Sequence, residues 1–516
     1  MPLGNRFAIL LFALYLLDVI FLFLYGLHLY IMIYLYKKNK KKCLSTSEKP
    51  IDLENTPLEQ IPEVAIQLPI YNEYYVVDRL LNSIKKIKWP KEKLYIQILD
   101  DSTDETVQKI ARFTEKLKNE GFKIEHFHRD NREGHKAGAL KEGLKKINAE
   151  FVAIFDSDFI PNVDFLVKTI PHFKDPRIGM IQTRWGHVNR DYSLLTYSQA
   201  FGIDGHFVIE QVARNGSGLW MNFNGTAGIW RKQCIIDAGN WESDTLTEDF
   251  DLSYRAQLAG WKFKYLMDIE NPAELPPTIH SFKSQQFRWC KGSIQTALKL
   301  IPKIIQSKLP LKIRLEAIIH LTNYSVHPLM VINILFTLPL VLIEKWSSFS
   351  YKELTTEIVF FIAFVLSLST FAPTIFYLYS QKELNRKWYK HIFAMPFLMM
   401  LGTGISISNT IAFLEAIFKK SSSFQRTPKF RIESKSAELY KRQKYIQKLD
   451  PIILLELIFF IYCLVTSYYA YMNHKYLMIS FMLIYASGFF YVIFLSVIQN
   501  FIIRFGYILK IFTKRI

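Results

Sequence analysis

The chain has 516 residues, enough for more than one domain with a sizeable core. Half of its residues are hydrophobic and they are clustered, which indicates a membrane protein and excludes a purely globular one. The net charge is +18, but no nucleic-acid module is present, and the basic residues crowd the ends of apolar stretches. The positive net charge is therefore better explained by the retention of basic loops on the cytoplasmic side and by contact with anionic lipid than by binding to nucleic acid. The four cysteines show no CxxC spacing, which argues against a disulfide framework or a structural zinc site and fits a reducing compartment.

The first apolar stretch covers residues 7–36 and contains one acid, Asp18. It is too long for the apolar region of a signal peptide, so we expect an uncleaved span. Five lysines between positions 37 and 42 follow it directly, which predicts a cytoplasmic end. Residues 1–42 are therefore predicted to be an N-terminal transmembrane helix with a basic stop.

Residues 50–280 have the pattern of a soluble α/β domain. Short apolar strands are predicted at 64–68, 94–99, 122–127 and 151–155, with helices at 75–87, 105–117 and 137–147 between them. Such alternation predicts a mostly parallel sheet covered on both faces, and ligands of these sheets bind at the carboxyl ends of the strands. Polar motifs follow three of the predicted strands, at 71–73, 100–101 and 156–158.

The rest of the chain is expected to be largely membrane-associated. Residues 281–312 are amphipathic and predict interfacial helices, 313–380 two transmembrane helices, 388–450 an interfacial segment and a loop, 451–503 two more spans, and 504–516 a cytoplasmic tail. The apolar stretch 391–418 has basic residues on both flanks, so both ends should be cytoplasmic and the stretch should not cross. This gives five spans, with the soluble domain inside the cell.

Two carboxylate motifs end predicted strands. Asp156 and Asp158, one residue apart, could hold a hard divalent cation against a diphosphate, although an isolated motif of this kind is more often a solvated turn. Asp100 and Asp101 could accept hydrogen bonds from a base or ribose, or could belong to the cap of the next helix.

Three further motifs carry candidate chemistry. Lys136 lies in the first turn of a predicted helix, where a bound phosphate would remove its unfavourable interaction with the helix dipole, although it could simply be exposed. Asp249, in Thr-Glu-Asp at the start of another helix, could act as a general base or could only stabilise the helix end. In Gln285-x-x-Arg288-Trp289, the arginine could neutralise a leaving diphosphate and the tryptophan could stack on a sugar, or both could anchor the chain at the interface.

Together these motifs resemble a family 2 glycosyltransferase of the cellulose-synthase-like type. The resemblance covers most of residues 60–295 and is carried by the stretches at 67–73, 99–104, 135–138, 156–158, 182–185, 223–228, 247–249 and 285–289, in family order. The stretches at 100–104 and 224–228 are most similar to the mannan-synthase-like and ceramide-glucosyltransferase-like branches.

The resemblance implies an inverting enzyme with a Rossmann-like GT-A domain on a transmembrane bundle. Asp249 would be the base, and Asp156 and Asp158 would hold Mg²⁺ or Mn²⁺. The expected nucleotide-sugar-binding residues are Asp101, Lys136, Asp156, Arg288 and Glu73, and the expected acceptor-binding residues are Trp289, Gln285, Gly225 and Thr226. Phe424, Thr427 and Lys429 match the cytoplasmic gating loop of cellulose synthases, or form an ordinary basic loop beside the membrane.

The sequence therefore predicts a hexosyltransferase of the cell (inner) membrane that transfers a sugar from UDP or GDP to a growing β-glycan. Its partners would be the nucleotide-sugar, the glycan or lipid acceptor and the bilayer. The alternative is a lipid glycosyltransferase that acts once at the cytoplasmic face. A transporter with a regulatory domain would leave the Asp motifs unexplained.

Overall fold

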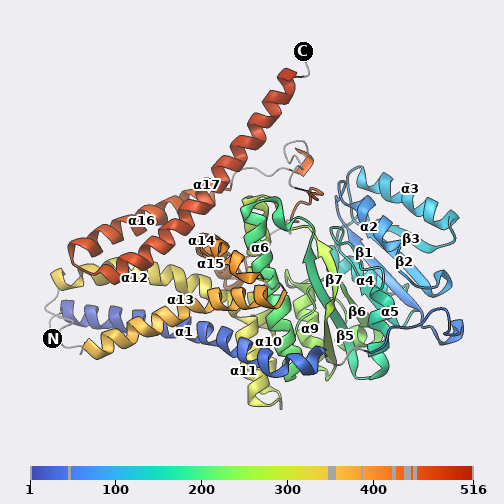
Figure 1. Ribbon diagram of the computed structural model, residues 1–516, viewed down its shortest axis with the longest axis horizontal. Helices are drawn as coiled ribbons and strands as arrows, with labels where there is room; N and C mark the ends of the chain where they lie inside the picture. The colour runs from blue at the N-terminus through green and yellow to red at the C-terminus, as the bar shows by residue number, and fades with distance from the viewer. Residues whose placement is uncertain are drawn as a thin grey trace.

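The computed structural model describes residues 3–44, 48–346, 356–384, 387–420, 426–434, 443–445 and 450–513. An α/β domain lies at one end of the molecule and long helices extend from it at the other (Figure 1). The helices of the α/β domain are α2 Val77–Ile84, α3 Thr106–Asn119, α4 His135–Leu144, α5 Phe165–Thr169, α6 Leu194–Asp204, α7 Gln211–Ser217, α8 Lys232–Asp237 and α9 Glu248–Leu258. A π-helical turn, η5 Gly205–Glu210, joins α6 to α7.

The sheet has seven strands in the order β3-β2-β1-β4-β6-β5-β7. Their bounds are β1 Val64–Ile70, β2 Leu94–Asp100, β3 Lys123–His128, β4 Phe151–Ile154, β5 Ile178–His187, β6 Gly228–Arg231 and β7 Lys262–Ala273. Strands β1 to β4 are parallel, which confirms the predicted strand–helix alternation. The antiparallel strand β6 joins them to the parallel pair β5 and β7, so the sheet is mixed, as in a GT-A domain.

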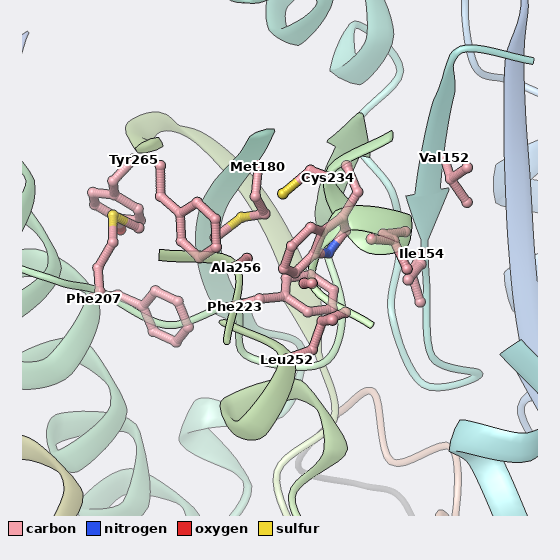
Figure 2. Packing of buried hydrophobic residues seen from close by; sticks show 14 of the residues in the cluster. Val152, Ile154, Met180, Phe207, Phe223, Cys234, Leu252, Ala256 and Tyr265 are labelled. Atoms are coloured by element: carbon pink, nitrogen blue, oxygen red, sulfur yellow. The ribbon is translucent and has the colours of Figure 1, made fainter. Parts of the chain in front are cut away.

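A hydrophobic core holds α9 against this sheet (Figure 2). Leu252 and Ala256 of α9 are fully buried in the same cluster as Ile154 of β4, Met180 of β5 and Phe223. Since residues three, four and seven apart share one face of a helix, the packing of Leu252 and Ala256 directs Asp249, one turn earlier, toward the strand ends.

The second half of the chain is almost entirely helical. Its helices are α10 Ile279–Gln306, α11 Leu311–Leu321, α12 Val326–Trp346, α13 Thr356–Leu384, α14 Met395–Gly404, α15 Ser406–Ile417, α16 Ile452–Met472 and α17 Tyr476–Thr513. The N-terminal helix α1 Leu3–Leu44 lies alongside α12 and α13 (Figure 1). The start of the chain therefore joins helices of the second half in one bundle.

Five described stretches are long and apolar enough to cross a membrane. They are Arg6–Lys41, Asn323–Leu342, Trp388–Ile417, Ile452–Met472 and Tyr476–Ile502. Four of them coincide with predicted spans, whereas Trp388–Ile417 contains the stretch that was expected not to cross. The second of the two spans predicted within residues 313–380 lies in α13. The side chains of the first residues of α13 are outside the described part of the structure.

The stretch Trp388–Ile417 is divided into separate helices. Helix α14 has 10 residues and α15 has 12. At 1.5 Å per residue each is about 15–18 Å long, against a hydrocarbon core of about 30 Å. Half of its most apolar window is buried inside the protein, compared with 22–39% in the other four stretches. These features favour the prediction that the stretch enters from the cytoplasm and returns to it.

Cysteine labelling can test this topology. We expect Lys390→Cys and Lys419→Cys, both at exposed positions, to react with a membrane-impermeant maleimide from the cytoplasmic side alone. The background should carry Cys43→Ser, because the other cysteines, Cys234, Cys290 and Cys463, are buried. Labelling of the two positions from opposite sides would show that the stretch crosses the membrane.

Candidate functional site

A pocket of about 180 Å³ lies beyond the carboxyl ends of β1, β2 and β4, where the sheet topology predicts a ligand site. It brings together residues from many separate parts of the sequence. The predicted site residues in its wall are Glu73, Asp101, Lys136, Asp156, Asp158, Gly225, Asp249, Gln285, Arg288, Trp289, Thr427 and Lys429. Thr226 is buried behind the wall, and Phe424 lies outside the described residues.

Asp249 lies in the first turn of α9 and its carboxyl group faces the pocket. Burial raises the pKa of Asp249 to about 7, and the neighbouring charge of Glu248 acts in the same direction. The positive charges of Lys136 and Arg288 oppose this shift. A carboxyl group with a pKa near neutrality can both accept and release a proton at physiological pH, as a general base requires.

Gly225 allows the chain to pass close to this carboxylate. Its φ is +79°, and a Cβ built on it would lie 2.9 Å from Asp249 Oδ2. The next residue, Thr226, accepts a hydrogen bond of 2.8 Å from the backbone N–H of Asp156 through its hydroxyl oxygen. Gly225 and Thr226 are two of the four residues expected to bind the acceptor. They therefore connect the start of α9 to the Asp-Ser-Asp turn.

Lys136, in the first turn of α4, is held by oxygen atoms of two other segments. Its ammonium group donates to Asp156 Oδ1 at 2.6 Å and to the Gly225 carbonyl at 2.9 Å. Burial disfavours the charged form, but the carboxylates of Asp156, Glu248 and Asp249 outweigh it and raise the pKa of Lys136. These carboxylates offset the unfavourable interaction of the Lys136 charge with the N-terminal end of the α4 dipole. The bound phosphate expected from the sequence is therefore not the only group that can do so.

Segment 426–434 follows α15 and crosses the pocket at Asp158. Lys429 Nζ lies 2.6 Å from Asp158 Oδ2, and Arg426 Nη1 lies 2.9 Å from Glu73 Oε1. The opposite charges of Asp158, Glu274 and Glu73 outweigh the burial of Lys429 and raise its pKa. Burial raises the pKa of Glu73 to about 7, although Arg426 and Lys429 partly oppose this.

The same segment is fixed to the sheet through Glu274, which follows β7. Both carboxylate oxygens of Glu274 accept backbone N–H groups, from Phe430 and from Arg431, at 2.8 Å each. The sequence motif marked Thr427 and Lys429 but gave no sign of Glu274, because a glutamate just beyond a strand has no pattern of its own. Segment 426–434 is thereby held over the pocket at two points.

Asp101 lines the pocket, but both of its oxygens are already engaged. Arg129 donates from Nε to Oδ1 and from Nη2 to Oδ2, each at 2.7 Å. Arg129 also donates to the carbonyl oxygens of Glu133 and His135, at the start of α4. Arg132, another residue that the sequence did not single out, lies 3.4 Å above the ring of Tyr71 in the pocket wall.

Gln285, Arg288 and Trp289 reach the pocket from α10, which packs directly on the start of α9. A Cβ built on Gly292 would lie 2.5 Å from Thr247 Cγ2 and 2.8 Å from the Thr247 backbone nitrogen. Only a glycine permits this approach, so the Thr-Glu-Asp and Gln-x-x-Arg-Trp motifs meet because one helix lacks a side chain at the crossing.

Two buried lysines fix α10 to the membrane half on either side of this motif. Lys283 Nζ lies 2.6 Å from Glu456 of α16, and Lys291 Nζ lies 2.9 Å from Glu415 of α15. Both lysines are at most 3% exposed. Removing one partner of such a buried pair costs about 3–5 kcal/mol, so α10 cannot shift far without the helices it is paired with.

The pocket wall next to Gly225 includes Asn224, which the sequence marked only as part of a motif. Its side-chain amide donates to His206 Nε2 at 3.1 Å, and its oxygen accepts from Gln211 at 3.0 Å. His206 lies in the π-helical turn η5, a feature that often marks functional sites. The amide of Asn224 is thus held at a fixed angle in the pocket wall.

A mixed sheet of this topology, with carboxylates and cations gathered beyond its parallel strand ends, defines a nucleotide-sugar glycosyltransferase of the GT-A class. Residues 62–292 match the family described as "Glycosyltransferase like family 2". The match confirms, over residues 62–292, the family 2 glycosyltransferase resemblance predicted from the motifs.

The chain is also similar to individual proteins. It is 42% identical over 262 residues to "Glucomannan 4-beta-mannosyltransferase 2" of Arabidopsis thaliana, covering 50% of this chain and 49% of that protein. It is 42% identical over 254 residues to "Glucomannan 4-beta-mannosyltransferase 1" of Oryza sativa subsp. japonica, covering 48% of each. The chain spans about half the length of these relatives. A solved mannosyltransferase, PcManGT from Pyrobaculum calidifontis in complex with GDP-Man and Mn²⁺, is 18% identical, covers 81% of this chain and 100% of its own, and has a TM-score of 0.49.

A pair of matched glycine substitutions can test the contact at Asp249. Both Gly225 and Gly218 have positive φ, but a methyl group added at Gly218 would meet no atom within 4 Å. Alanine at either site should destabilise the fold by roughly 1 kcal/mol or more. We expect only Gly225→Ala to displace Asp249 and reduce transfer by about 10²-fold, as misplaced catalytic groups do. Equal activity of the two variants would contradict this role for Gly225.

Proposed function

We propose that the protein is a membrane-embedded, inverting glycosyltransferase that adds mannose from a nucleotide-sugar to a growing β-glycan. The observation that carries the proposal is the position of Asp249, in one pocket with the Asp-Ser-Asp turn and with Arg288 of α10. The choice of mannose rests on the 40–42% identity to glucomannan 4-β-mannosyltransferases across the catalytic domain. The helices next to the pocket that are long and apolar enough to cross a membrane support a polymer that leaves through the membrane.

The proposed reaction is a single displacement. The Asp249 carboxylate accepts the proton of the acceptor hydroxyl as that oxygen forms a bond to the anomeric carbon of the donor. The bond between that carbon and the diphosphate breaks on the opposite face, so the configuration inverts. Lys136 and Arg288 line the same pocket and would neutralise the departing diphosphate, since charge-assisted hydrogen bonds to phosphate are strong.

Asp156 and Asp158 fit a hard divalent cation. Both offer carboxylate oxygens, the ligands that Mg²⁺ and Mn²⁺ prefer, and they lie on one turn beyond β4. Each carboxylate is paired with a lysine, Asp156 with Lys136 and Asp158 with Lys429, so a bound cation would have to replace these ammonium groups. A bound Mg²⁺ or Mn²⁺ would supply Lewis-acid stabilisation of the diphosphate. Lys429 would then have to release Asp158, so we expect donor binding and movement of segment 426–434 to be linked.

Acceptor binding is assigned to the α10 side of the pocket. Trp289 offers a ring face to the C–H groups of a sugar, and Gln285 offers an amide for its hydroxyls. Gly225 and Thr226 lie in the segment before β6, which passes close to the proposed base, Asp249. We infer that the catalytic domain is cytoplasmic, because basic residues flank the spans on that side.

The product decides between polymer synthesis and a single transfer to lipid. Purified protein should be incubated with radiolabelled GDP-mannose and a panel of UDP-sugars. We expect a long glycan that is retained with the membrane fraction and degraded by an endo-β-mannanase. Trp289→Ala should reduce elongation far more than hydrolysis of the donor, because water needs no sugar platform. A product that extracts into organic solvent as a monoglycosylated lipid would establish the lipid glycosyltransferase instead, and the absence of any transfer would favour the transporter.

The pH profile tests the base. Asp249 must be deprotonated to accept a proton, so kcat/KM should fall as the pH drops through about 7. Asp249→Asn should lose about 10²–10⁴-fold in transfer but still bind nucleotide. The charge of Glu248 raises the pKa of Asp249, so Glu248→Gln should move the acidic limb of the profile to lower pH. A profile that is flat between pH 5 and 8 in every variant, or Asp249→Asn activity within threefold of wild type, would exclude Asp249 as the base.

A further inference from the structure

A second group of potential metal ligands lies outside the pocket, on the face of β2 and β3. Asp100 ends β2, and His126 and His128 lie on the edge strand β3. Asp100 is paired in register with His128, while His126 is two residues earlier and therefore on the same face of the strand. One carboxylate oxygen and one nitrogen of each imidazole all lie within 4.8 Å of one another.

The two imidazoles converge on one oxygen atom. Asp100 Oδ2 lies 2.9 Å from His126 Nε2 and 3.4 Å from His128 Nδ1. Two ligands that share a tetrahedral zinc ion at about 2.0–2.1 Å are separated by roughly 3.4 Å. The spacing therefore matches that of atoms on a common ion, with a small adjustment between the two rings.

The surroundings supply the other features of such a site. The backbone N–H of Ser102 donates to Asp100 Oδ1 at 2.9 Å, which orients the carboxylate as a second-sphere partner would. The His126 side chain is 14% exposed and that of His128 is 35% exposed, so an ion can enter from the His128 side.

We propose that Asp100, His126 and His128 form a binding site for zinc or a similar borderline transition metal, distinct from the Asp156–Asp158 pair. Imidazole nitrogen with one carboxylate suits Zn²⁺, whereas Mg²⁺ and Mn²⁺ prefer oxygen ligands. The absence of CxxC spacing excludes only a thiolate site, and an alternating His-x-His on a strand is the sequence signal that identifies this one.

A second group of carboxylates is already neutralised by a lysine. Glu242, Asp244 and Asp251 also come together, but Lys299 lies between them and contacts all three. Its ammonium group already supplies the positive charge that a metal would bring. Among the described residues, no lysine or arginine makes an ion pair of this kind with Asp100.

The ion would fasten two strand ends that carry donor-site residues. Asp100 precedes Asp101, and His128 precedes Arg129, whose side chain holds Asp101 by two hydrogen bonds. The Arg129 backbone N–H also donates to the Asp100 carbonyl at 3.0 Å. A metal shared by β2 and β3 would therefore stabilise the Asp101–Arg129 pair without touching the donor.

Zinc titration of the purified, chelator-treated full-length protein tests this site. The protein should carry Asp158→Asn, so that the Asp-Ser-Asp turn contributes no second binding event. We expect one Zn²⁺ per chain by calorimetry, and a Co²⁺ complex with the visible absorption of a tetrahedral or five-coordinate site. His126→Gln and His128→Gln should each weaken Zn²⁺ binding by at least tenfold, while His474→Gln, in an exposed turn, should not change it.

Asp100→Asn separates the metal from an ordinary hydrogen-bonded array. The single amide oxygen of asparagine can meet the imidazoles or the Ser102 N–H but not both, so this variant should be less stable than its parent even without zinc. The decisive quantity is the rise in thermal midpoint that Zn²⁺ produces within each protein, which we expect in the parent and not in Asp100→Asn. Zinc binding that is absent, or that is unchanged in the two histidine variants, would overturn the proposal and leave the glycosyltransferase assignment untouched.

Discussion

The constraint on which the structure depends is the pairing of buried charges around the pocket. Each ion removed from water costs several kcal/mol unless an opposite charge meets it in good geometry. Asp156 is met by Lys136 of α4, Asp158 by Lys429 and Glu73 by Arg426 of segment 426–434. The partners come from segments far apart in the sequence, so the pocket is satisfied only when these segments have closed on one another.

The same constraint joins the catalytic and membrane halves. Lys283 and Lys291 lie eight residues apart on α10, on either side of Arg288, and each is neutralised by a glutamate of a different membrane helix. Helix α10 therefore belongs to both halves at once. A displacement of α15 or α16 would therefore be transmitted to Arg288 and Trp289 in the pocket wall.

The first half of the sheet could be predicted from the sequence because β1, β2 and β4 are short apolar runs, and each of the strands β1 to β4 is followed by a helix. Strands β5 to β7 were missed, since β6 and β7 pair with distant partners and carry polar residues such as Arg231 and Glu270. Motifs identified most of the pocket wall, including Asp249 and Lys136. They could not reveal Glu274 or Arg129, whose roles arise from contacts that only the folded chain creates. Hydropathy alone marks the stretch 388–417 as long and apolar enough to cross, and the prediction that it does not cross rests on its flanking charges and its division into short helices.

The spacing between the proposed base, Asp249, and the proposed diphosphate-binding Arg288 is set by residues that touch neither reactant. Asp249 is carried by α9, whose position follows from Leu252 and Ala256 in the core. Arg288 is carried by α10, which reaches α9 only because Gly292 has no side chain against Thr247. A larger residue at 292 would push the helices apart and leave both reactive groups intact but separated. In the proposed displacement, the base and the arginine that neutralises the diphosphate lie on opposite sides of a single sugar ring, so the contact at Gly292 sets whether the two motifs can act on the same molecule.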